Sequence, residues 1–104
     1  MAHAAPASSS PDVLDGPART ELERIRRRWA QLPLATAQEQ SSALRALAEH
    51  LAGLTAPGVP LADLGPAALP DQLAVLAWDA VAAGGPEAAA DVTERLVALR
   101  RALP

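Results

Sequence analysis

The segment spanning residues 70–83 constrains the fold most, because it is apolar on nearly every side. It opens with Pro70 and Asp71, which suit the first turn of a helix, where proline loses no hydrogen bond and the helix dipole stabilises a carboxylate. Gly84 and Gly85 follow, and glycine supplies the positive φ at which many helices end. A helix that is apolar all round is normally packed on all sides. We therefore expect a helix over residues 70–83 at the centre of the fold.

Three further segments carry apolar residues at alternating spacings of three and four, the pattern of a helix with one buried face. Residues 17–32 begin with a proline and end before another. Residues 36–54 open with a capping box, in which Thr36 is followed three positions later by Glu39. Residues 86–103 begin with a proline directly after the glycine pair. The three apolar stripes are Leu22, Ile25, Trp29 and Leu32; Leu44, Leu47, Leu51 and Leu54; and Val92, Leu96, Leu99 and Leu103.

The composition agrees with an all-α fold. Half of the 104 residues are hydrophobic, and the alanine and leucine that dominate them favour helices over strands. Trp29 and Trp78 are the only aromatic residues, so the core must be built from leucine and alanine around them. We predict a single domain over residues 16–104, folded as a small four-helix bundle around the helix at 70–83. Residues 1–15 have few bulky apolar side chains, which predicts a disordered tail.

Charge and residue content exclude several classes of function. The net charge is −3, so no overall basic field attracts nucleic acid. The chain has no cysteine, which excludes disulfides, a thiolate nucleophile and a cysteine-based zinc site. No secretory signal pattern opens the sequence, and no apolar run reaches the ~20 residues that span a bilayer. We expect a soluble cytoplasmic protein without a membrane partner.

The sequence also gives little support to catalysis. His50 is the only histidine inside a predicted helix, and no phosphate-binding loop, cofactor fingerprint or metal-ligand cluster accompanies it. A general base needs a positioned hydrogen-bonding network, which the neighbours of His50 do not supply. We therefore predict a non-enzymatic protein with no catalytic, cofactor-binding or metal-binding residues.

The central helix has a second apolar side, formed by Val75, Trp78 and Ala82 and opposite its leucine-rich side. This second side is either the last wall of the core or part of an interface, and the exposure of Trp78 distinguishes the two. Asp79 stands beside it and interrupts the most apolar helix of the chain. A carboxylate there either marks a solvent-exposed edge of the helix or, if it is buried, accepts hydrogen bonds from an arginine or a helix N-terminus. We predict protein–protein interaction through this side, by self-association as a homodimer or as an adaptor subunit.

The helix at 17–32 carries a run of basic side chains that offers an alternative function. Glu21 and Glu23 stand three or four positions before most of these arginines, which favours a salt-bridged, solvated face. The arginines also spread over three sides of the helix rather than one. An acidic protein partner and a nucleic-acid-associated regulator are the alternatives, the latter less favoured. The residues concerned are Arg24, Arg26, Arg27 and Arg28.

Overall fold

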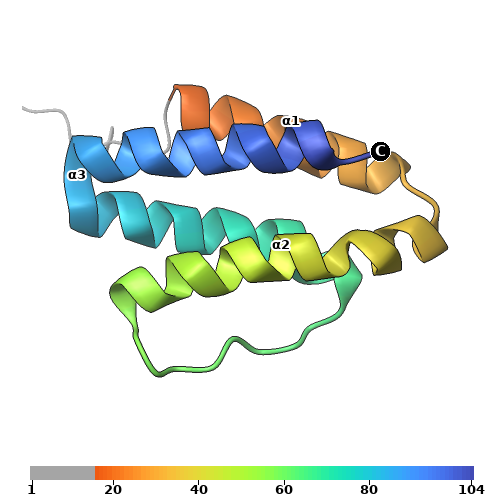
Figure 1. The fold of residues 1–104 in the computed structure, drawn as a ribbon, viewed down its shortest axis with the longest axis horizontal. Helices are drawn as coiled ribbons and strands as arrows, with labels where there is room; N and C mark the ends of the chain where they lie inside the picture. The colour runs from red at the N-terminus through yellow and green to blue at the C-terminus, as the bar shows by residue number, and fades with distance from the viewer. Residues whose placement is uncertain (1–15) are drawn as a thin grey trace, which may run out of the picture.

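The computed structural model describes residues 16–104, and this part of the chain forms three α-helices and a 3₁₀ turn, with no strand (Figure 1). The all-α prediction is confirmed for these residues, while the predicted tail at 1–15 lies outside them. An extended connection links the second helix to the 3₁₀ turn. The elements in chain order are α1 (Pro17–Gln31), α2 (Leu34–Thr55), η2 (Pro66–Ala68) and α3 (Leu69–Ala102).

The prediction of four separate helices is wrong, because α3 contains both helices that we expected over residues 70–83 and 86–103. Gly85 lies inside α3 with φ 71° and ψ −154°, a conformation open almost only to glycine, and Pro86 follows it. One residue thus absorbs the whole change of direction, and the proline starts helical structure again at once. The second arm of α3 (residues 86–102) runs back along the first arm (residues 69–84) in the opposite direction (Figure 1).

The core lies between α1, α2 and the two arms of α3, and α3 packs against both other helices. Its fully buried large side chains come from every helix: Ile25 from α1, Leu44 and Leu51 from α2, Leu73 from the first arm and Leu96 from the second. Burying each such side chain is worth about 1.5–3 kcal/mol. The predicted stripe of the second arm is buried in full, whereas that of α1 is buried except for Leu32, which is partly buried.

The stripe of α2 differs from the prediction at its end. Leu54 is 54% exposed, whereas the smaller Ala37 and Ala48 are buried. The predicted capping box is also wrong, because α2 begins at Leu34 and its first turn receives no side-chain cap. The carbonyl of Pro33 instead accepts the first helical hydrogen bond, from the amide of Ala37 at 2.9 Å.

Side chains of α2 and α3 hold the extended connection that leads to η2. The guanidinium of Arg45 donates to the carbonyl of Leu61 at 3.0 Å, and the amide of Gln72 donates to the carbonyl of Ala62 at the same distance. These bonds bind carbonyls that have no partner of their own in regular structure. They fix the path of the connection against α2 and the first turns of α3.

Candidate interaction surface

The first arm of α3 exposes one row of side chains, at intervals of four, three and four residues. Such intervals place side chains on one line along a helix. Val75 is 61% exposed and Trp78 is 45% exposed, while Asp71 and Ala82 are also exposed. We call Asp71, Val75, Trp78 and Ala82 the exposed strip. Apolar side chains exposed singly are common, but apolar residues that adjoin one another along one helix face can mark an interaction site.

Of the two alternatives left open for this side of the helix, a last wall of the core is excluded by the exposure of Trp78. The opposite side of the helix is buried, through Leu73, Ala77, Ala80 and Val81. The other helices cover that side and its flanks, and none of the described residues covers the strip, where Trp78 stays almost half exposed.

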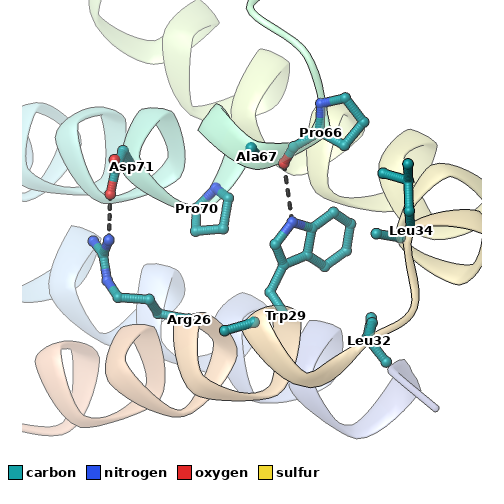
Figure 2. A pocket seen from close by; sticks show the side chains of 10 residues that line it. Arg26, Trp29, Leu32, Leu34, Pro66, Ala67, Pro70 and Asp71 are labelled. Atoms are coloured by element: carbon teal, nitrogen blue, oxygen red, sulfur yellow. Dashed lines mark hydrogen bonds and ion pairs between the residues drawn. The ribbon is translucent and has the colours of Figure 1, made fainter.

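Beside the strip, a pocket of about 350 Å³ opens between α1, the start of α2 and η2 (Figure 2). The indole of Trp29 points from α1 into it, with Pro70 on one side of the ring and Leu34 on the other. The indole N–H donates to the carbonyl of Pro66 at 2.9 Å, which fixes the ring plane and satisfies its one polar group. The pocket is lined by Arg26, Trp29, Ala30, Leu32, Leu34, Ala37, Pro66, Ala67, Pro70 and Asp71.

No pattern in the sequence predicts this pocket. The bond between Trp29 and Pro66 joins residues 37 positions apart. The only local signal is Leu34, which lies just before the predicted start of the second helix and is 69% exposed. An exposed leucine beside a tryptophan is too common to identify a pocket without the fold.

An ion pair between Arg26 and Asp71 closes the end of the pocket that faces the strip (Figure 2). The prediction that Glu23 would hold Arg26 is wrong, because the first arm of α3 brings Asp71 closer. Both side chains are more than half exposed, so the pair adds at most about 1 kcal/mol to stability. Asp71 belongs to both the strip and the pocket wall, so the two features meet at this residue.

The four arginines singled out in the sequence do not gather on this surface. Arg24 pairs with Glu21 at 2.8 Å, as their spacing predicts. Arg26 alone lines the pocket. Arg27 and Arg28 are exposed, and neither forms an ion pair with another residue in the described range.

Glu21 is the one buried charged residue among residues 16–104. Its carboxylate accepts hydrogen bonds from Arg24 and from Arg100 of the second arm. Burial on its own would raise the pKa of Glu21, but the hydrogen bond and charge of Arg100, together with Arg24, outweigh it and lower the pKa below 4.5. The sequence identified the Arg24 partner, whereas Arg100 lies 79 positions away and was missed. This cluster joins α1 to α3 and has a structural role.

The remaining candidates stand apart from each other. Asp79 is half-buried, and His50 is exposed on α2. Neither makes a hydrogen bond or ion pair with another residue of the described range. Between residues 16 and 104 no three histidine or acidic side chains come together as metal ligands. In the same range, no helix has the length and apolar character needed to cross a membrane.

Comparison of the chain with protein-family models, with curated proteins and with solved structures finds no match.

Proposed function

We propose that this protein is a small, non-enzymatic helical interaction module, which binds another protein or a second copy of itself through the exposed strip and the adjoining pocket. The observation that carries the proposal is the exposure of Trp78 in the middle of that strip. Tryptophan is among the residues most enriched at the energetic centres of interfaces, because one side chain covers a large area at little entropic cost. The proposed location is the cytoplasm.

The surroundings of Trp78 support the same role. Val75 and Ala82 extend the apolar surface along the helix, and the pocket over Trp29 continues it past Asp71. An apolar centre with a charged pair at its edge is the usual composition of a protein interface. Catalysis is not part of the proposal, because Asp79 and His50 each lack a described partner that could position a proton transfer.

Co-purification from the native cell with variants of the strip tests this function. Tagged wild-type protein is compared with the Val75→Ser, Trp78→Ser double variant, and we expect the partner recovered with the wild type to be lost. Leu54→Ser is the matched control, because Leu54 is a similarly exposed apolar residue on α2. A partner that binds the double variant as well as the wild type contradicts the proposal.

The alternative function, a nucleic-acid-associated regulator, rests on the exposed Arg27 and Arg28. It is the weaker proposal, because Arg24 and Arg26 are held by acidic partners and the net charge is −3. Retention on mixed-sequence DNA or RNA at low salt is its test.

A further inference from the structure

We propose that the segment just before α1 folds back on the exposed strip, so that Val13 and Leu14 cover the ring of Trp78 until a partner displaces them. The inference rests on the proposed function and adds its regulation, because one ring cannot contact the segment and a partner at once. Three observations carry it: the exposure of Trp78, the register of α1 against the first arm of α3, and the residues that adjoin Gly16.

Two contacts fix how α1 lies against the start of α3. Arg26 pairs with Asp71. Three residues later on α1, Trp29 donates to the carbonyl of Pro66, which precedes Asp71 by five residues. Residue numbers thus rise along one helix as they fall along the other, and the two run antiparallel here (Figure 2). The start of α1 therefore lies toward the end of the first arm.

The same register places Trp78 beside the first turn of α1. Arg19 precedes Arg26 by seven residues, and Trp78 follows Asp71 by seven. Equal steps along antiparallel helices bring Arg19 level with Trp78. Seven residues also make about two full turns, so each residue stays within about 20° of its starting line, and Arg19 lies on the side of α1 that Arg26 presents to the strip. Gly16 lies only about 4.5 Å further along the helix axis.

The chain before Gly16 is long enough to reach the ring. An extended chain covers about 3.3–3.6 Å per residue, so Leu14 reaches about 7 Å from Gly16, and Val13 reaches about 10 Å. The axes of packed helices lie about 8–10 Å apart. Val13 and Leu14 are also the only branched aliphatic residues among residues 1–15. The segment therefore carries its apolar side chains at about the distance that separates Gly16 from Trp78.

Charge favours the same occupant. Asp12 and Asp15 lie on either side of the apolar pair in the sequence, and the exposed cation of α1 that is level with the ring is Arg19. Carboxylates next to the start of α1 are also stabilised by the helix dipole, which is positive at that end. Two acids around two aliphatic residues thus complement both parts of this surface, the arginine and the ring.

A short tether distinguishes this segment from a free partner. Only Asp15 separates Leu14 from Gly16, and short linkers give effective concentrations on the order of millimolar. A second copy or another protein at about micromolar concentration needs an intrinsic affinity about a thousandfold higher to occupy the strip equally. The segment is therefore the favoured occupant of the strip in the free protein.

The contact should be weak enough for a partner to displace. Covering two aliphatic side chains gains hydrophobic free energy of the same order as the conformational entropy that four ordered residues lose. Closed and open forms should therefore have similar populations, which lowers the apparent affinity of a partner about twofold. The segment thus tunes access to the strip without blocking it.

Fluorescence quenching of Trp78 in the full chain tests the contact. Trp29→Phe is the background for every variant, because it leaves Trp78 as the only tryptophan. Val13→Ser with Leu14→Ser should raise the acrylamide quenching constant up to about twofold and shift the emission to longer wavelength, because the covered part of the population opens. Far-UV circular dichroism checks that the helix content is unchanged.

The matched control removes two apolar side chains from residues 1–15 at positions remote from Gly16. Ala4→Ser with Ala5→Ser should quench like the background protein, and equal quenching in the two double variants overturns the inference. Each measurement is repeated at a lower protein concentration. Quenching that depends on concentration but not on Val13 and Leu14 shows a second copy as the occupant, which also overturns the inference.

A further variant tests the charge part of the contact. Arg19→Gln should raise the quenching constant part of the way, whereas Arg28→Gln, exposed on the opposite flank of α1, should not. The effect of Arg19→Gln should vanish in the chain that carries Val13→Ser and Leu14→Ser, because Arg19 acts through the segment. A change that persists there overturns the pairing of the acids with Arg19.

Failure of this inference differs from failure of the proposed function. If strip variants lose a cellular partner but Val13→Ser with Leu14→Ser leaves the quenching of Trp78 unchanged, the function stands and the inference fails. If the quenching rises but strip variants lose no partner, the function fails and only the covering of the ring stands. The segment variant should capture a partner about twofold more strongly than the wild type. Weaker capture overturns the inference, because the segment would then belong to the interface.

Discussion

Glu21 of α1 and Arg100 of the second arm of α3 form a hydrogen-bonded ion pair across 79 positions of sequence. The carboxylate is almost completely buried, and Arg24 binds its other oxygen. The pair joins the first helix of the domain, α1, to the second arm of the last helix, α3. Its contribution can be measured without disturbing the proposed interaction surface.

Replacement of Glu21 by Gln should lower the free energy of unfolding by about 1–3 kcal/mol, because it leaves Arg100 without its charged acceptor beside the core. Urea denaturation followed by circular dichroism measures the change. Glu23→Gln is the matched control on the same helix, since Glu23 is exposed, and it should change stability by less than about 0.5 kcal/mol. Equal effects for the two variants would contradict a specific role for the buried pair.

The same pair predicts a pH dependence. Because the folded protein holds the pKa of Glu21 below its usual 4.5, the unfolded chain takes up a proton first as the pH falls. The stabilisation is complete above pH 4.5 and is lost as the pH falls through the lower, folded pKa. The stability difference between wild type and Glu21→Gln should therefore shrink on acidification, as urea midpoints at neutral and acidic pH would show. A difference that grows on acidification would contradict the lowered pKa.

Much of the fold follows from local sequence. Pro17 marks the start of the first helix, and apolar stripes such as that around Ile25 identify the core because helical spacing alone decides which side chains share a face. Gly85 was expected to end a helix, and its positive φ is confirmed. Pro86 was expected to start a helix directly after the glycine pair, and the second arm begins there. The sequence does not reveal that Gly84 stays helical, so that the two segments form one bent helix.

The candidate surface was only half predictable. The position of Trp78 around the helix identified the strip. Whether Trp78 is exposed depends on how many other helices cover it, and the spacing of apolar residues does not decide that. The pocket was missed because the bond between Trp29 and Pro66 and the pairing of Arg26 with Asp71 join distant segments. Local rules put Glu23 beside Arg26, and the tertiary fold supplied a different partner.

The bend of α3 should tolerate no side chain. Alanine at Gly84 would place its Cβ 2.5 Å from the Cβ of Ala88, and alanine at Gly85 would be strained at φ 71°. Each substitution should cost about 1–3 kcal/mol. Gly53→Ala is a control that should instead raise the free energy of unfolding by about 0.4–1 kcal/mol, because Gly53 lies in α2 with open space around it. Thermal unfolding of the three variants checks the order, and a stable Gly85→Ala variant would contradict the bend.

The indole N–H of Trp29 should stabilise the fold as well as shape the pocket. Trp29→Phe keeps an aromatic ring but loses the hydrogen bond to the carbonyl of Pro66, which should cost about 1–2 kcal/mol. Trp78→Phe is the matched change at an exposed position and should leave the monomer's stability within about 0.5 kcal/mol. Urea denaturation at concentrations low enough to keep the chain monomeric separates the two. Equal losses would show that the bond to Pro66 adds nothing.

The arginines of α1 give the last prediction, on nucleic acid. Arg24 and Arg26 are held by Glu21 and Asp71, which leaves Arg27 and Arg28 as cations without an ion partner in the described range. Two phosphate contacts would give a salt slope of only about −2, too little for firm binding by a chain of net charge −3. We expect no retention on mixed-sequence DNA at low salt, by wild type or by the Arg27→Ala, Arg28→Ala variant. Retention that is lost in this variant but kept in Arg95→Ala would instead favour the nucleic-acid function.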